Sequence, residues 1–188
     1  MEILIVLAVI AVPVVIILGY VIRIYNALIR IKNQCDESWS DVETEMQRRY
    51  DLIPNLVNTV KGYASHEKEL LEEVTRLREQ AVADHGSPAH QAQTENMLQG
   101  ALGKLMVRLE AYPDLKANQN FLELQRELTN TEDRIQAALR FYNGNVRDNN
   151  NKVQVFPSNI VAGIFGFGLR EFFELQNEEA RQAPTVQF

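Results

Sequence analysis

The chain has 188 residues, which is enough for one compact domain with an appendage but not for two full domains. Hydrophobic residues make up 46% of the chain and charged residues 23%, and the formal net charge is -6 at pH 7. Because a nucleic-acid surface needs a concentrated field of Lys and Arg, this acidic balance argues against a nucleic-acid partner. Because Cys35 is the only cysteine in the sequence, no intrachain disulfide can form.

The N-terminal segment, residues 3–22, carries no charged side chain. At about 1.5 Å per residue, a helix of this length spans roughly 30 Å, the thickness of the hydrocarbon core of a bilayer. A cleaved secretory signal is the alternative, but the positively charged n-region and an A-x-A-like cleavage site are both missing. We therefore expect residues 1–22 to form a retained transmembrane anchor that contacts membrane lipid through residues 3–22.

The residues that flank this segment predict its orientation. Only Met1 and Glu2 precede it, whereas Arg23, Arg30 and Lys32 follow it closely. Since the basic flank of a span normally stays in the cytoplasm, we expect a short N-terminus outside and the large C-terminal part in the cytoplasm.

After the anchor, apolar residues recur with a mean spacing of about 3.6 residues, which is typical of one face of a long straight helix. They are Leu28, Ile31, Cys35, Trp39, Val42, Met46, Tyr50, Ile53, Val57, Val60 and Ala64. Pro54 should remove the hydrogen bond to the Tyr50 carbonyl and bend the helix, and Gly62 is a second weak point. A continuous helix to Val82 would outrun its partners. Either it breaks near Gly62 and supplies two bundle helices, or its membrane-proximal half packs against the C-terminal segment or another protomer.

Two further helices follow in the sequence. Residues 84–88 should end one helix and start the next, with Ser87 as the N-cap and Pro88 in the first turn. The second helix carries an apolar line to Leu109 and should reverse at residues 112–114. The third carries its apolar line over residues 121–146.

The third helix should fade near residues 149–151, three consecutive asparagines, and end before Pro157. Short loops between amphipathic helices predict an all-α fold, an antiparallel up-down bundle of three to four long helices behind the anchor. The expected parts are the anchor at 1–22, a cytoplasmic bundle at 23–155, an apolar packing segment at 156–176 and a mobile polar tail at 177–188.

We find no motif for catalysis, a cofactor or a metal ion. His66 and Glu67 begin like the zinc motif H-E-x-x-H, but Leu70 stands where the second histidine is needed. A di-iron helical bundle needs Glu-x-x-His motifs, and none of the three histidines has a glutamate three positions before it. That class of protein is therefore excluded. Cys35 lies on the apolar line beside Asp36 and Glu37, which should raise its thiol pKa, so we interpret it as a buried structural cysteine.

A second line of residues runs beside the apolar line of the first helix, with spacings of 3 and 4 residues. This polar stripe consists of Arg48, Asp51, Asn55, Thr59, Gly62 and His66. It is either a solvated flank or a contact surface between helices or protomers, where low bulk permits close approach and hydrogen bonds fix the register.

The C-terminal apolar segment is too short to cross a bilayer and must be covered in another way. Its candidate contact residues are Ile160, Ile164, Phe165, Phe167, Phe172 and Phe173. Packing on the bundle, docking on the membrane surface and contact with a neighbouring subunit are all open.

Several blocks of residues carry a resemblance to a known family. They include Tyr25-Asn26-Ala27-Leu28, Ser38-Trp39-Ser40-Asp41, residues 48–57 (Arg-Arg-Tyr-Asp-Leu-Ile-Pro-Asn-Leu-Val), residues 60–67, Ala117-Asn118, Thr131-Glu132, Phe141-Tyr142-Asn143 and Phe156-Pro157. The chain resembles the LemA family of bacterial membrane proteins over nearly its whole length. The resemblance implies a single-pass protein of the bacterial cytoplasmic (inner) membrane with a helical cytoplasmic domain, and it implies no known catalysis.

The sequence therefore favours a non-enzymatic, membrane-anchored helical scaffold that self-associates as a homo-oligomer at the cytoplasmic membrane face. The alternative is an adaptor or regulator that docks onto another membrane protein, such as a membrane protease. An enzyme or transporter component is disfavoured, because no convergent acid, base, metal or nucleotide site is found.

Overall fold

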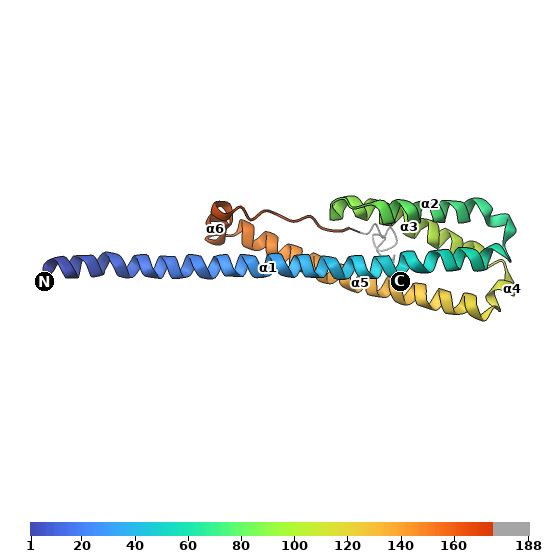
Figure 1. Cartoon of the computed structure of the whole chain (residues 1–188), viewed down its shortest axis with the longest axis horizontal. Helices are drawn as coiled ribbons and strands as arrows, with labels where there is room; N and C mark the ends of the chain where they lie inside the picture. The colour runs from blue at the N-terminus through green and yellow to red at the C-terminus, as the bar shows by residue number, and fades with distance from the viewer. Residues whose placement is uncertain (175–188) are drawn as a thin grey trace, which may run out of the picture. The chain divides into compact units, whose positions relative to one another are not determined.

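The computed structural model describes residues 1–174, apart from the side chains of residues 3–6, 8 and 65, so the expected tail at 177–188 lies outside the described residues. All regular secondary structure in the described part is helical, which confirms the predicted all-α fold. The elements in order are α1 (Glu2–Lys61), η1 (Ser65–Glu67, a single 3₁₀ turn), α2 (Lys68–Ala83), α3 (Pro88–Leu109), α4 (Pro113–Lys116), α5 (Gln119–Gln154) and α6 (Ser158–Phe165), as labelled in Figure 1.

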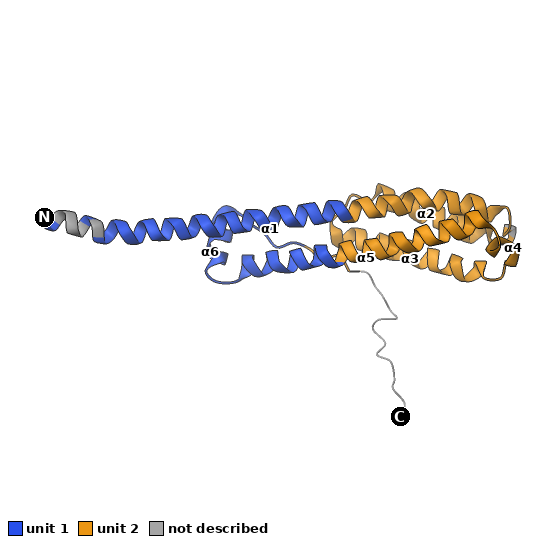
Figure 2. Ribbon diagram, turned by 90° about the horizontal axis from the view of Figure 1, so that it is seen from below, with its two compact units in different colours: residues 1–41, 140–170 blue, residues 42–139, 171–188 orange. Residues whose placement is uncertain are grey.

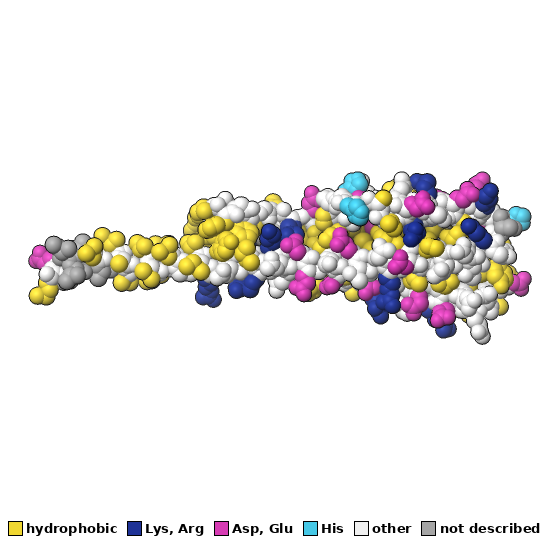
Figure 3. All heavy atoms as spheres, viewed as in Figure 1, with side chains coloured by type: hydrophobic (Ala, Val, Ile, Leu, Met, Phe, Trp, Pro, Cys, Tyr) yellow, Lys and Arg dark blue, Asp and Glu magenta, His cyan; other side chains and the backbone are white. Residues whose placement is uncertain are grey.

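The first helix begins with a segment that is long and apolar enough to cross a membrane. Its side chains from residue 9 to residue 20 are exposed, as a lipid-facing helix requires. Figure 3 shows hydrophobic side chains over the visible face of this part of α1. This agrees with a membrane-anchoring helix near the N-terminus.

The first helix is continuous across Pro54 and ends at Lys61. Beyond Lys61 the backbone N–H groups of Tyr63 and Ala64 both donate to the Val60 carbonyl at 2.9 Å, and the chain turns into η1 and α2. The break near Gly62, one of the two predicted alternatives, is therefore present and supplies two helices.

The carbonyl that Pro54 leaves without a helical donor is bound by another helix. Arg78 of α2 donates its Nε–H to the Tyr50 carbonyl oxygen at 2.7 Å. The predicted loss of a hydrogen bond at Pro54 is thus offset by a charged donor across the interface between α1 and α2, and the helix continues.

The chain divides into two compact units, coloured blue and orange in Figure 2. Unit 1 contains residues 1–41 and 140–170, and unit 2 contains residues 42–139 and 171–188.

Unit 2 is an antiparallel arrangement of the second part of α1, then α2, α3 and the first part of α5, joined by short connections (Figure 2). Its core is made by the apolar faces of these helices and includes Met46, Ile53, Leu56, Val60, Leu71, Val74, Leu98, Leu105, Leu109 and Ile135. The predicted up-down bundle is confirmed in this unit.

The connection between α2 and α3 falls at the predicted residues, but Ser87 stands at the N-cap without a side-chain capping bond. The turn is instead organised by Asp84, which accepts hydrogen bonds from the Gly86 N–H at 2.9 Å and from the Thr94 hydroxyl at 2.7 Å. Burial raises the pKa of Asp84, but these two bonds and one from His90 outweigh it and leave the pKa below its ordinary value.

Unit 1 pairs the first part of α1 with the end of α5 and with α6. Leu28 of α1 is fully buried against Val161 and Ala162 of α6. This is the second predicted alternative, since the membrane-proximal half of α1 packs on the C-terminal segment. Both alternatives occur because α1 is long enough to contribute to each unit.

Cys35 is fully buried in unit 1, as predicted. Burial is the largest cause that raises the pKa of its thiol, and Asp36 and Asp148 raise it further, whereas Arg170 lowers it. The neighbouring carboxylate predicted from the sequence therefore contributes less than desolvation does.

The third helix ends before Pro157, as predicted, but it does not fade near residues 149–151, because α5 continues to Gln154. Asn149 and Asn150 donate their side-chain amides to the carbonyls of Gly168 at 3.2 Å and Arg170 at 2.9 Å. The Arg170 N–H donates in return to the Asn150 side-chain oxygen at 2.8 Å. These side chains bind a neighbouring segment and do not compete with their own helix, so the helix persists.

Candidate functional site

The C-terminal apolar segment is split by the structure into buried and exposed side chains. Within α6, Ile160, Ile164 and Phe165 are exposed, the most exposed being Ile164 at 71%. Phe167 is half-buried, and its ring and that of Phe165 lie 5.7 and 4.8 Å from the ring of Tyr25. Unit 1 therefore keeps an apolar surface of its own around α6, which gathers as yellow spheres in Figure 3.

The other two candidate residues of this segment belong to unit 2. Phe172 is exposed there, whereas Phe173 is fully buried and fills part of the core. The six candidate residues therefore do not form one surface within a single unit.

The polar stripe lies on unit 2. Arg48, Asp51 and Asn55 are exposed on α1, and Thr59 is half-buried. Asp51 accepts a hydrogen bond from Gln47 at 2.8 Å, and the Thr59 hydroxyl donates to the Asn55 carbonyl at 2.9 Å. The polar groups of this part of the stripe are thus accessible at the surface of unit 2, as both a solvated flank and a contact surface require.

The last two residues of the stripe lie beyond the end of α1. Gly62 is in the turn and His66 is in η1, and both are exposed. The stripe is therefore not a single helical line to His66, because the chain reverses at Gly62. A Cβ atom at Gly62 would meet only the Thr59 carbonyl oxygen, at 3.8 Å, which is ordinary van der Waals contact.

A buried charge network in unit 2 was not predicted from the sequence. Arg49 of α1 binds Glu95 of α3 through Nη2, and it binds Glu132 of α5 through Nη1 at 2.8 Å. The Tyr50 hydroxyl donates to the other oxygen of Glu95. The side chains of Arg49 and Glu95 are only 3% and 2% exposed, and burial, the largest influence on Tyr50, raises its pKa to about 12.

The partly buried Glu132 extends this network towards the surface. Its second oxygen accepts hydrogen bonds from Gln99 of α3 at 3.0 Å and from Gln136 at 3.2 Å. The network thus connects three helices of unit 2 with paired charges, the arrangement that a buried ion requires.

The sequence does hold a signal for this network. Arg49, Glu95 and Glu132 stand in helical phase with buried apolar residues, for example Glu95 three positions before Leu98. A charged residue in phase with an apolar line is the pattern of a buried ion, but the sequence alone does not say which charges meet.

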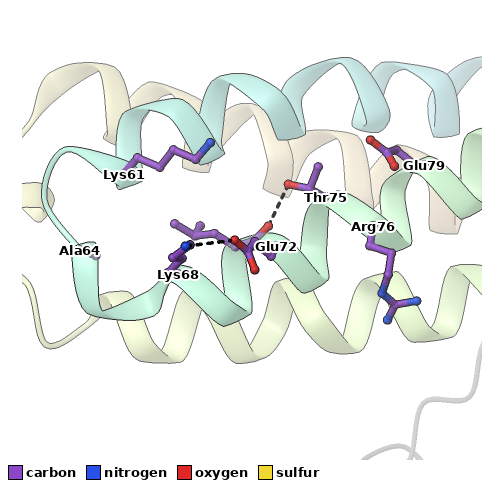
Figure 4. Close-up of a pocket in the computed structure, with 8 residues that line it drawn as sticks. Lys61, Ala64, Lys68, Glu72, Thr75, Arg76 and Glu79 are labelled. Carbon is purple, nitrogen blue, oxygen red and sulfur yellow. Dashed lines mark hydrogen bonds and ion pairs between the residues drawn. The ribbon is translucent and has the colours of Figure 1, made fainter.

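A depression of about 540 Å³ lies where α1 turns into α2 (Figure 4). Its lining combines apolar Ala64 and Leu71 with charged side chains such as Lys61. Lys68 and Glu72 face each other at 3.8 Å, and their side chains are 80% and 68% exposed. These charges are solvated, and the depression offers no buried acid, base or nucleophile for chemistry.

Among the residues that the structure describes, no group of three or more His, Cys, Asp or Glu side chains is arranged to hold a metal ion. The contact of His90 with Asp84, 3.0 Å from Nδ1 to Oδ1, belongs to the turn between α2 and α3.

Comparison with known proteins finds several bacterial relatives of this chain. It is 28% identical over 137 residues to Protein LemA of Metamycoplasma hominis, covering 73% of this chain and 63% of that protein, so it spans less than two thirds of that relative's length. It is 26% identical over 187 residues to Magnetosome protein MamQ 2 of Paramagnetospirillum magneticum and 25% identical to Magnetosome protein MamQ of Magnetospirillum gryphiswaldense, covering 86% of this chain and 68% of each relative. None of these names is that of an enzyme. Residues 38–188 match the profile of the LemA family, and the chain therefore belongs to the LemA family.

Proposed function

We propose that this chain is a non-enzymatic, membrane-anchored helical scaffold that self-associates at the cytoplasmic face of a bacterial membrane. One observation carries the proposal: the single helix α1 bears both the apolar anchoring segment and the exposed residues Arg48, Asp51 and Asn55 of the polar stripe. The expected anchor and the proposed contact surface are thus parts of one continuous helix.

The physical advantage of this arrangement is concentration. Anchoring confines every copy to a thin layer, so a contact that is weak in solution is populated at the membrane. The stripe combines a cation, an anion and an amide on consecutive turns of α1, which are groups that pair across two copies of the same helix face.

The proposal is tested by the particle mass of the full-length protein in mild detergent. The test variant combines two substitutions in the stripe. Asp51→Lys reverses a charge and Gly62→Leu adds bulk, and neither residue belongs to the buried core. We expect this variant to lose the assembly while its helical content and its unfolding transition stay unchanged.

A matched control places the same two changes elsewhere on unit 2. Glu123→Lys and Gly100→Leu alter positions on α5 and α3 that lie outside the core, and a Cβ atom at Gly100 meets no atom within 4 Å. The control should keep the parent particle mass. An unchanged mass for the stripe variant, or an equal loss in the control, would refute the proposal, and a monomer that copurifies with another membrane protein at fixed ratio would favour the adaptor function.

A further inference from the structure

We infer that α6 and the turn that precedes it form a membrane-surface element, which inserts its exposed apolar side chains into the bilayer interface beside the point where α1 leaves the membrane. The partner is an anionic phospholipid bilayer. This inference concerns unit 1 alone and does not depend on self-association.

The first argument is the level at which α6 packs along α1. Its buried residues Val161 and Ala162 meet Leu28, and the half-buried Val21, Ile24 and Tyr25 pack against the same cluster. Val21 is inside the apolar anchoring segment, and Leu28 is six residues beyond its end, about 9 Å along the helix. Because the headgroup region on each side of a bilayer is about 5–8 Å thick, the stretch of α1 that α6 covers, from Val21 to Leu28, runs through the interface when residues 3–22 occupy the hydrocarbon core.

The second argument is the chemistry of the exposed side chains. The turn between α5 and α6 exposes Val155 and Phe156, the latter at 74%, and α6 continues with Ile160, Ile164 and Phe165. A turn that faces water is normally polar. Here the turn and the outer side of α6 present apolar groups next to an apolar span, which is the pattern of an element that lies in the interface.

The third argument is charge. Arg23, Arg30 and Lys32 are exposed on the same stretch of α1, just beyond the anchoring segment. Lys32 also lines a surface depression of about 440 Å³ together with the rings of Tyr25 and Phe165, whereas Arg170, in the same lining, binds Asp36 at 2.6 Å. Cations and aromatic rings around an apolar element are the groups that meet anionic phosphates and the headgroup layer.

The structure also shows how α6 is held in place. Gly166 adopts a left-handed conformation (φ 73°) and ends α6, with its N–H bonded to the Ala162 carbonyl. The chain then returns to α5 through the bonds of Asn149 and Asn150 to Gly168 and Arg170. The element is therefore fixed to α1 and α5 by its inner side, and its outer side stays free for lipid.

The test uses the full-length protein in vesicles of phosphatidylethanolamine and phosphatidylglycerol, with the native Trp39 replaced by Phe. Phe165→Trp and, separately, Ile164→Trp place a fluorescent reporter at exposed positions of α6. The control is Phe141→Trp, on α5 of the same unit, because Phe141 is 64% exposed and Phe165 is 52% exposed. The ring of Tyr142, the residue after Phe141, packs on Trp39. Trp39 lies about 16 Å further along α1 than Leu28, so the control position is farther from the anchoring segment than α6 is.

Phospholipids brominated near the top of their acyl chains quench only a tryptophan that reaches them. We expect both α6 reporters to lose most of their emission and the Phe141→Trp control to lose little. In each variant, a Cys35 thiol that does not react with a water-soluble maleimide shows that unit 1 is folded. If one of the two tryptophan substitutions disturbs the fold, the other still gives the answer.

Two outcomes would overturn the inference. In the first, the α6 reporters are quenched no more than the control. In the second, their emission shifts to shorter wavelength only as the protein-to-lipid ratio rises, without quenching by bromine, and the surface is then covered by a second copy of the chain. Replacement of phosphatidylglycerol by phosphatidylcholine should weaken the quenching, because the cations beside α6 then lose their anionic partners.

Discussion

The contact between Arg78 and the Tyr50 carbonyl explains how a long helix tolerates Pro54, and it can be measured by a double-mutant cycle. Arg78→Met removes the donor but keeps an apolar side chain of similar length. In the parent protein this variant leaves the Tyr50 carbonyl without either of its donors, because Pro54 has no N–H to offer. We therefore expect Arg78→Met to destabilise the folded protein.

The magnitude follows from the kind of bond that is lost. The donor is a charged guanidinium at 2.7 Å and the acceptor belongs to a buried residue, so the loss should be about 2 kcal/mol, within the range of hydrogen bonds to charged groups. In a Pro54→Ala background the alanine N–H can donate to the Tyr50 carbonyl. Arg78→Met should then cost less than about 1 kcal/mol, and the coupling between the two positions should be about 1 kcal/mol or more.

The assay is chemical denaturation of the parent, the two single variants and the double variant, followed by far-ultraviolet circular dichroism in the same detergent. Arg76→Met is the matched control, since Arg76 lies on the same helix and its guanidinium bonds within that helix to Gln80, at 3.1 Å in an exposed position. An equal cost of Arg78→Met in the parent and in the Pro54→Ala background would refute the reasoning, because the carbonyl would then not be what Arg78 satisfies.

Three other predictions follow from the buried and titrating groups. Arg49→Met should lower the free energy of unfolding by about 3–5 kcal/mol, because it leaves the Glu95 carboxylate buried without its cation. In the same denaturation assay, the double variant Arg49→Met with Glu95→Leu should recover most of that loss. The pKa of Asp84 is lowered in the folded state, so its contribution to stability is present above its unfolded pKa of about 3.9 and is lost as the pH falls through the lower folded value. Asp84→Asn should therefore reduce the loss of stability of the parent below about pH 4, and an unchanged pH profile would contradict this. Cys35 should resist a water-soluble maleimide in the folded protein at pH 8 and react fully in denaturant, because burial protects the thiol and raises its pKa. Equal reaction rates in the folded protein and in denaturant would contradict this and show that unit 1 opens easily.

The parts of the fold that depend on local pattern could be predicted from the sequence. The apolar lines indicate the helices, and the Pro and Gly residues at 84–88 and 112–114 indicate the connections. The end of α1 at Lys61 is harder to predict, because the apolar line runs through Val60 and Ala64 without interruption. The apolar line continues because both residues are buried in the core, although the chain changes direction between them. A reversal whose residues are still buried does not change the apolar periodicity.

The errors concern polar residues whose partners are distant in the sequence. The composition around Asn149 and Asn150 predicts a weakened α5, but these residues bind a segment about 20 residues away. The spacing marks Arg49 as a candidate buried charge but does not identify its partners, which lie 46 and 83 residues further on. Composition and spacing describe what a residue does to its own helix, whereas these residues act through contacts that exist only after the helices have packed.

The buried charge network has a consequence for how unit 2 selects its arrangement. Four amphipathic helical stretches with similar apolar faces can pack in several registers, since a shift of one turn exchanges one leucine for another at small cost. A buried Arg49 does not tolerate such a shift, because it must meet Glu95 on α3 and Glu132 on α5 at the same time. Paired ions of this kind add little net stability compared with apolar residues, so their value here is the register that they impose. The double replacement of Arg49 and Glu95 by apolar residues is therefore expected to unfold at nearly the same denaturant concentration as the parent and to lose the near-ultraviolet dichroism of a uniquely packed core.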